Sequence, residues 1–319
     1  MTMLIADDRN LNSTPFWKDF IVRGDLFQEF CDHTFWNNAH PVPNPHFKAG
    51  SIVFCKIDAV LSLFEQLRLT RKQIVLVTGE GDFPCDAFRQ KFLPKNVLHW
   101  FSTNVTHPHP RVSAIPLGLG SPDDPVTLKS SEFLAAQQKA TSKDHWLLVA
   151  FRPETNRRVR QKIYDYFKQR SEHESWITFQ PPSVSTSHDF FLTQLTRHHF
   201  ILCPPGNGVD THRLWETLTA GSYPIVLRSQ AMMPFEELPI LFVNHIEEIT
   251  LDFLQQNLQQ LEEKKKNLSM LTMPFWEQKI QSAKSELAGQ ELMPWRDWLE
   301  ESIRYVWSMF RGHTCSRVR

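Results

Sequence analysis

The stretch from Leu202 to Leu227 reads LCPPGNGVDTHRLWETLTAGSYPIVL. Its apolar start and end are separated by a loop rich in Pro and Gly and by a segment with helical spacing. The pattern predicts a strand ending at Cys203, a loop, a helix from about Thr211 to Ala220, and a strand from Ile225 to Leu227. A strand-loop-helix-strand unit of this kind is typical of a parallel sheet covered by helices.

The loop and the helix start in this stretch have the composition of an anion site. Gly206 and Gly208 let backbone N–H groups approach an anion closely, and Asp210 or Thr211 can cap a helix whose N-terminal end favours phosphate. The spacing fits neither a P-loop, which needs Gly-Lys-Ser/Thr, nor a dinucleotide fingerprint, which needs a third glycine. The candidate binding residues are Gly206, Asn207, Gly208, Asp210, Thr211, His212, Arg213 and Glu216.

Arg213 and Glu216 lie within one helical turn of each other. An arginine neutralises diphosphate charge, and a carboxylate accepts hydrogen bonds from ribose hydroxyls, so the pair suits a nucleotide-sugar. His212 would reach a phosphate or a sugar hydroxyl. The alternative interpretation is an ordinary crossover helix with a surface ion pair after a Gly-rich turn. The coincidence of all these residues at one helix start favours the binding site.

At this point the sequence resembles a known family, the exostosin-type glycosyltransferases (glycosyltransferase family 47 and its bacterial and viral relatives). The longest similar block is PPGNGVDTHRLWETLTAGSYPIV at 204–226, and shorter ones are 149–152 with 156–160 and 100–104 with 116–119. The resemblance implies a GT-B fold, in which two Rossmann-like domains with parallel sheets face a central cleft and C-terminal helices cross back. It also implies inverting transfer from a nucleotide-sugar, with no obligatory metal and no cofactor.

The resemblance also gives roles to a basic loop near the middle of the chain. A predicted strand over 146–151 is followed by a cluster of cationic and amide side chains: Arg152, Asn156, Arg157, Arg158 and Arg160. By resemblance, Arg152 and Arg160 are the expected phosphate contacts, where bidentate arginine bonds are favourable. Arg157 and Arg158 are expected to be exposed.

The whole chain is large enough for two domains and carries no net charge. Its 319 residues include 35 Lys and Arg against 35 Asp and Glu, so no global field argues for a nucleic-acid partner. Five scattered cysteines suit reduced thiols. We find no signal peptide and no apolar run of about 20 residues that would span a bilayer. The expected location is therefore cytoplasmic, with an alternative at the inner face of the membrane.

The first half shows a strand-helix-strand rhythm that also argues for a parallel sheet. The strand at 73–78 ends at Thr78 and is followed by Gly-Glu-Gly-Asp. This puts Glu80 and Asp82 beyond the carboxyl end of the strand, where ligands bind in such sheets. Inverting transfer needs a base to take the acceptor hydroxyl proton. Asp82 is the first candidate, Glu80 the second and Asp58 a distant third. The alternative for Asp82 is a conformational role in the turn before Pro84.

A second candidate region follows the predicted strand at 97–101. Asn104 and His107 are candidate acceptor-site residues, and His107 or His109 is an alternative base. The motif His-Pro-His-Pro at 107–110 is unsuited to zinc, since no cysteine or carboxylate set lies nearby.

Turn residues and a polar run between 121 and 144 predict a hinge between domains. We expect an acceptor-binding Rossmann-like domain over 1–140, a nucleotide-sugar-binding exostosin domain over 141–285, and a helical segment over 286–319. Aromatic residues near the C-terminus have helical spacing and suit packing of the crossing helices. The basic segment from Arg311 to Arg319 would contact an anionic lipid headgroup, the alternative being a frayed tail.

The sequence therefore predicts a transferase of polysaccharide biosynthesis, moving a UDP-linked sugar to a glycan or lipid-linked hydroxyl. Two alternatives stay open. One is a fucosyltransferase-like GT-B enzyme that uses a GDP-sugar, and the other is a catalytically silent protein that binds nucleotides or sugars. Fold resemblance does not fix the donor, the acceptor or the linkage.

Overall fold

Two separate parallel sheets organise the chain. The computed structural model describes residues 21–35, 47–121, 123–124, 127–139, 142–182, 187–286, 289 and 292–314. Among these, residues 21–26 and 116–276 form unit 1, and residues 27–115 and 277–314 form unit 2. Each unit contains one five-stranded parallel sheet, which confirms the predicted pair of Rossmann-like α/β domains. The acceptor-binding domain over 1–140, the donor-binding domain over 141–285 and the helical segment over 286–319 stay predictions.

Unit 2 has a sheet in the order β1-β2-β3-β4-β5. Its strands are β1 (His33–Thr34), β2 (Ile52–Lys56), β3 (Ile74–Gly79), β4 (Val97–Ser102) and β5 (Val112–Ala114). Strand β3 is buried along its whole length, as expected for a strand covered on both faces. The helices are α2 (Val60–Leu67), α3 (Ala87–Lys91) and α10 (Trp295–Thr314), with residues 277–285 of α9 (Met273–Ser285), while α1 (Gly24–Phe30) begins in unit 1.

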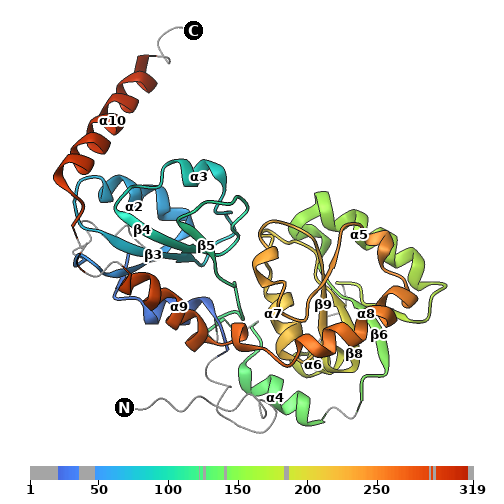
Figure 1. Cartoon of the computed structure of the whole chain (residues 1–319). Coiled ribbons are helices and arrows are strands. Elements are labelled where there is room, and N and C mark those ends of the chain that lie inside the picture. The colour runs from blue at the N-terminus through green and yellow to red at the C-terminus, as the bar shows by residue number, and fades with distance from the viewer. Residues whose placement is uncertain are drawn as a thin grey trace, which may run out of the picture. The chain divides into compact units, whose positions relative to one another are not determined.

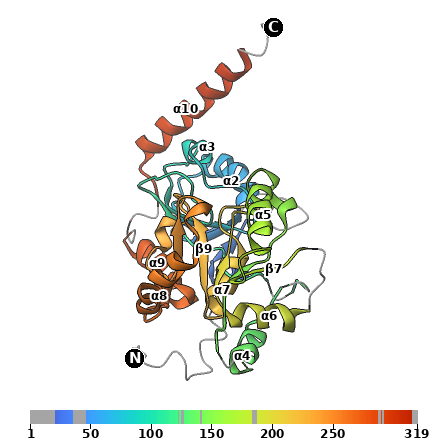
Figure 2. The ribbon, with the colours of Figure 1, turned by 90° about the vertical axis from the view of Figure 1, so that its right-hand side faces the viewer.

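Unit 1 has a sheet in the order β10-β9-β8-β6-β7. Its strands are β6 (His145–Val149), β7 (Ile177–Phe179), β8 (His198–Leu202), β9 (Tyr223–Leu227) and β10 (Leu241–Val243). Its helices are α4 (Ser130–Lys139), α5 (Arg157–Ser171), α6 (His188–Arg197), α7 (His212–Thr219) and α8 (Leu251–Lys264). Figures 1 and 2 show α5, α6, α7 and α8 around this sheet. The core includes Leu147, Phe167, Phe200, Tyr223 and Leu254.

The C-terminal helices return to the unit formed by the first half of the chain. Helix α9 (Met273–Ser285) begins in unit 1, where Trp276 is fully buried, and ends in unit 2. Within unit 2, Lys284 of α9 donates to Asp32, and Trp298 of α10 donates to the carbonyl of Arg68. The predicted return of these helices is confirmed. The side chains beyond residue 307, including those of the basic segment Arg311–Arg319, lie outside the described ones.

Candidate functional site

The strand order of unit 1 contains one reversal, between β6 and β8. The chain leaves β6 toward β7 on one side and then returns to place β8 on the other side of β6. Loops that leave the carboxyl ends of strands at such a point diverge and form a ligand crevice. The loop over 150–156 and the loop over 203–211 both begin there. The basic loop and the Gly-rich loop found in the sequence are therefore brought together.

Arg160 connects these two loops. Its guanidinium donates to the carbonyl oxygens of Pro204 (2.9 Å), Pro205 (2.9 Å) and Arg152 (3.1 Å), and to the Thr155 hydroxyl (2.6 Å). The side chain is 8% exposed. Burial, followed by the nearby charge of Arg213, lowers the pKa of Arg160 to about 10. Four hydrogen bonds hold the guanidinium in place. Because all four acceptors are neutral, none of them cancels its positive charge.

The Gly-rich loop turns its carbonyl groups toward α5. Beside the two bonds from Arg160, the Gly206 carbonyl accepts from the Asn156 side chain at 2.9 Å. No cis peptide occurs in the described residues, and in a trans peptide the N–H points opposite to the carbonyl. The N–H groups of Gly206 and Asn207 therefore point away from Arg160 and Asn156.

Gly206 is a glycine because of Arg160. A Cβ added at Gly206 would lie 3.0 Å from an Nη atom and 3.5 Å from Cζ of Arg160. The guanidinium cannot withdraw without losing its bonds to the loop. The sequence analysis attributed this glycine to the approach of an anion, and the structure supplies a second reason, the approach of a buried arginine.

Helix α7 begins at the end of the Gly-rich loop without a side-chain cap. Thr211 occupies the N-cap position, as predicted, but its hydroxyl makes no capping bond. Asp210 turns inward, where its carboxylate accepts from the Leu117 N–H and the Trp215 indole N–H, both at 2.8 Å. Burial raises the pKa of Asp210 to about 6, and these two donors oppose the rise. The Thr211 hydroxyl therefore does not bond the first N–H groups of α7, which lack partners within the helix.

His212 joins the first turn of α7 to the segment after Pro116. Its Nδ1 lies 2.8 Å from the Gly118 carbonyl oxygen, which can only accept, so Nδ1 carries the proton. The other ring nitrogen, Nε2, belongs to an exposed ring. Gly118 has φ +73°, and a Cβ there would lie 2.2 Å from the Val22 carbonyl oxygen. Only glycine fits this position.

Arg213 and Glu216 form the predicted pair on the first turns of α7. Nε of Arg213 donates to the Glu216 carboxylate at 3.0 Å, and Nη1 donates to the Ala150 carbonyl at 2.5 Å. The guanidinium also lies over the Phe191 ring, 4.1 Å from its centroid. These contacts bring the Arg213 side chain to the carboxyl end of β6. The Ala150 carbonyl that it bonds belongs to the same loop as Arg152. The side chains of Arg152, Arg157 and Arg158 are exposed.

Unit 2 has its own group of candidates at the carboxyl ends of β3 and β4. Glu80 and Asn104 are the non-glycine residues with positive φ in the described part of the chain, at 54° and 52°. Thr78 pairs with Ser102 across the two strands, so Glu80 and Asn104 follow the strands at the same level. Left-handed backbone is costly for Glu and easier for Asn. Such outliers concentrate at functional sites.

Asp82 follows Glu80 on the same loop, and Asp58 lies in the 3-10 turn Ile57–Ala59 after the neighbouring strand β2. Asp82 is exposed, and Asp58 pairs with Lys56 at 3.3 Å. A Cβ at Gly81 would lie 2.6 Å from a methyl carbon of Ile57. The loop after β3 therefore packs against the loop after β2 and brings the three candidate carboxylates to one edge of the sheet.

A buried polar network lies beneath this edge, and the sequence analysis missed it. The Thr78 hydroxyl donates to Ser102 at 2.7 Å and accepts from the Trp100 indole at 2.8 Å, and Ser102 donates to the Thr103 carbonyl. Thr78 and Ser102 are hydroxyl residues near the ends of two largely apolar strands. That placement was the available signal. The network fixes the two strand ends from which Glu80 and Asn104 emerge.

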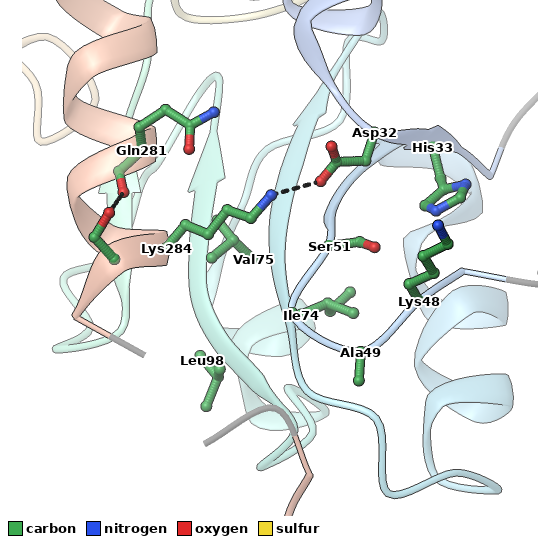
Figure 3. A pocket seen from close by; sticks show the side chains of 12 residues that line it. Asp32, His33, Lys48, Ala49, Ser51, Ile74, Val75, Leu98, Gln281 and Lys284 are labelled. Carbon is green, nitrogen blue, oxygen red and sulfur yellow. Dashed lines mark hydrogen bonds and ion pairs between the residues drawn. The ribbon is translucent and has the colours of Figure 1, made fainter. Parts of the chain in front are cut away.

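His107 lies apart from these candidates. It lines a hollow of about 410 Å³ together with α3 residues and Arg111, and Glu80, Asp82 and Asn104 are not among the lining residues. A larger hollow, of about 640 Å³, lies at the opposite, amino-terminal edge of the sheet, lined by Ser51, Ile74 and Leu98 among others. Figure 3 shows Lys284 of α9 reaching Asp32 there. The sequence analysis singled out nothing in this second hollow.

Two features are absent from the described ranges. None of their helices is long and apolar enough to cross a bilayer. No three side chains of His, Cys, Asp or Glu gather there in a way that could hold a metal ion. The expectation of a metal-independent reaction without a cofactor stays a prediction.

Comparisons with known proteins were made with the sequence and with the fold. A family model described as the Exostosin GT47 domain matches residues 32–241, which are 210 of the 319 residues. No curated protein matches the sequence.

Among solved structures, the chain is similar at low identity to the three that follow. An α1,3-fucosyltransferase has 13% identity and a TM-score of 0.40, with 78% of this chain and 80% of that chain covered. An α,α-trehalose-phosphate synthase (UDP-forming) from Burkholderia vietnamiensis has 10% identity and a TM-score of 0.39, with 74% and 75% covered. A GtfA/B complex has 10% identity and a TM-score of 0.39, and this chain spans 58% of the matched chain while 75% of this chain is covered.

Proposed function

Because the chain belongs to the exostosin GT47 family of glycosyltransferases, we propose that it is an inverting enzyme that uses a nucleotide-sugar, with UDP as the expected nucleotide. The diphosphate binds in unit 1, at the switch point between β6 and β8. The acceptor is the hydroxyl of a glycan or of a lipid-linked sugar, and it is received by unit 2.

One observation carries the donor site. The carbonyl groups of Pro204, Pro205 and Gly206 are all bonded to Arg160 or Asn156. This arrangement turns the Gly206 N–H away from α5 and leaves the charge of Arg160 without a bonded carboxylate. An uncapped helix start and Arg213 lie at the same loop. Backbone N–H groups, a helix N-terminus and fixed guanidinium charge are together suited to a diphosphate.

Each candidate residue of unit 1 has its own role in donor binding. Arg213 neutralises diphosphate charge, and Arg160 acts mainly as a positioning residue, because four of its N–H groups are bonded to the loops. Exposed Arg152 supplies a second direct phosphate contact. Glu216 accepts hydrogen bonds from the ribose or donor sugar, and His212 reaches a phosphate or sugar hydroxyl with the exposed side of its ring.

The reaction we propose is a single displacement. A carboxylate of unit 2, Asp82 first and Glu80 second, takes the proton from the acceptor hydroxyl as its oxygen attacks the sugar carbon. The bond from that carbon to the diphosphate oxygen breaks, and the nucleoside diphosphate leaves with the electron pair. Negative charge developing on the diphosphate is stabilised by the Gly206 loop, the start of α7 and Arg213. Asn104 is only 4% exposed, and its left-handed backbone shapes the loop that receives the acceptor.

The experiment is a screen of nucleotide-sugars for slow donor hydrolysis, with UDP and GDP binding measured by calorimetry. UDP binding that Glu216→Ala weakens at least tenfold, and that Arg158→Ala leaves unchanged, supports the donor site. Arg158 is the control because it is an exposed arginine at the start of the neighbouring helix α5. Preference for GDP would favour the fucosyltransferase-like alternative. Nucleotide binding without hydrolysis or transfer of any donor would favour the silent alternative.

A further inference from the structure

Helix α10 of unit 2 has an apolar face that is largely exposed. Its contacts with the rest of unit 2 include those of Trp298, Glu301, Ser302 and Tyr305, and Arg71 lies over the Trp295 ring at one end of this face. A second set of positions is exposed: Trp295 (64%), Leu299, Ile303, Val306 and Trp307 (63%). At 3.6 residues per turn these five fall within an arc of about 120°, separate from the contact face. We name this set the α10 stripe.

The α10 stripe holds five of the eleven large exposed hydrophobic side chains among the described residues. Five others lie elsewhere in unit 2, and one, Phe190, lies in unit 1. Aromatic side chains present about 150–250 Å² each, so Trp295 and Trp307 alone expose roughly 200 to 300 Å². Soluble monomers rarely expose contiguous apolar patches beyond a few hundred Å². With Leu299, Ile303 and Val306 added, the stripe has the size at which exposed apolar patches are often interaction sites.

Basic side chains lie close to the stripe. At 3.6 residues per turn Arg296 falls inside the apolar arc, while Asp297, Glu300 and Glu301 fall outside it, Glu300 about 20° beyond its edge. The guanidinium of Arg71 lies 4.5 Å from the centroid of the Trp295 ring. Arg68, with no acidic residue between it and Arg71, lies over Tyr305.

We propose that the α10 stripe docks on an anionic lipid surface, with α10 lying in the interface and its tryptophans among the headgroups. Tryptophan and leucine on one face with arginine at its border are the composition of interfacial helices. A second copy of the chain fits less well. A left-handed coiled coil needs apolar residues at a mean spacing of 3.5. The spacing from Trp295 through Leu299 and Ile303 to Val306 averages about 3.7. The interaction does not depend on the transfer chemistry.

The test is flotation of the full chain with vesicles of phosphatidylglycerol and phosphatidylcholine, and with phosphatidylcholine alone. We expect binding to the anionic vesicles, weakened at least tenfold in Leu299→Glu and Ile303→Glu and reduced by added salt. Phe190→Glu, which changes an exposed apolar residue of unit 1, is the matched control and should bind as the unchanged protein does. Thermal unfolding of each variant checks folding, and exposed positions should leave the midpoint within about 2 °C.

Three results would overturn the proposal. The first is no binding to the anionic vesicles, and the second is equal loss in Phe190→Glu. The third is a concentration-dependent dimer that Ile303→Glu dissociates while no vesicles bind, which would assign the stripe to a second copy. Donor hydrolysis measured without vesicles should be the same in Leu299→Glu and the unchanged protein, so failure here is separable from failure of the donor site.

Discussion

The carboxyl edges of the two sheets are built by different means. In unit 1, long-range side chains hold the loops: Arg160 bonds to Pro204 and Pro205, and Asp210 bonds to Leu117, 93 residues away. In unit 2, the backbone itself is unusual, because Glu80 and Asn104 are left-handed at the ends of adjacent strands. The charged groups of the first edge are largely bonded to backbone, while Glu80 and Asp82 on the second edge are exposed.

The difference matches the chemistry proposed for each edge. A diphosphate site gains from groups that are fixed before the ligand arrives, since no reorganisation is then needed as charge develops. A base must instead approach a hydroxyl and exchange a proton, so an accessible carboxylate on a shaped loop suits it. The comparison predicts that substitutions in unit 2 change the rate, and that substitutions in unit 1 change donor affinity and stability together.

The largest expected effect is on the rate. Asp82→Asn should lower kcat by about 10² to 10⁴, the usual contribution of a positioned general base, with donor affinity and thermal stability unchanged. Because Asp82 is exposed and Asn has nearly the same shape, folding should be unaffected. The measurement is kcat and KM with the donor identified by the screen.

Glu80→Gln is the matched comparison for Asp82→Asn. If Asp82 is the base, the Glu80 variant should lose much less than tenfold in kcat. The reverse order would transfer the role to Glu80, and two unaffected variants would remove the base from this edge of unit 2.

Arg160→Ala should have the next largest effect, on stability. It leaves the buried carbonyls of Pro204 and Pro205 without their donor, at about 1–3 kcal/mol each, so a loss of roughly 3 kcal/mol or more is expected. Thermal unfolding should show a fall in Tm of about 6 °C or more. Arg160→Lys keeps a charge but cannot bond several carbonyls at once. Its Tm should lie between those of Arg160→Ala and the unchanged protein. An Arg160→Ala protein as stable as Arg158→Ala would contradict the bracing role of Arg160.

A smaller effect is expected at Gly206. In Gly206→Ala the new Cβ would press on Arg160 from 3.0 Å, and overpacking of a fixed group costs about 1–2 kcal/mol. Donor KM should rise in parallel if, as proposed, the N–H groups of the displaced loop bind the diphosphate. Gly79→Ala in unit 2 is the control, since its Cβ would meet nothing nearer than 3.8 Å. Equal behaviour of the two variants would mean that the loop tolerates displacement.

Much of the fold and less of the site could be predicted from the sequence. The helix expected at about Thr211–Ala220 is α7 (His212–Thr219), and the strand expected at Ile225–Leu227 is β9 (Tyr223–Leu227). Periodicity identifies such elements because burial of one face is repeated along the chain.

The partners of the site residues could not be read from spacing. Arg160 was assigned to a phosphate, but a guanidinium bonds equally well to carbonyl oxygens, and only the fold brings Pro204 and Pro205 to it. Asp210 was considered as a helix cap, and its partners prove to be Leu117 and Trp215. The positive φ of Glu80 had no signal in the sequence, because glutamate rarely adopts it.

The smallest predicted effect concerns the pH dependence of unit 1. Burial raises the pKa of Asp210 from 3.8 to about 6 in the folded protein. The folded state therefore favours the protonated carboxyl, and its contribution to stability is fully present below pH 3.8 and is lost as the pH rises through about 6. With these two values, the loss between pH 5 and pH 8 is roughly 1.4 kcal/mol.

Asp210→Asn removes this titration and tests it. The variant should be less stable at every pH, because the amide NH₂ of Asn faces one of the two donors, the Leu117 N–H or the Trp215 indole N–H, that now bond to oxygen. The deficit should shrink by roughly 1.4 kcal/mol between pH 5 and pH 8, since only the unchanged protein pays the cost of ionising a buried carboxyl. Denaturant unfolding at the two pH values measures it. A deficit that grows with pH would mean that the two N–H donors hold Asp210 ionised and that the edge of unit 1 is braced by a charge.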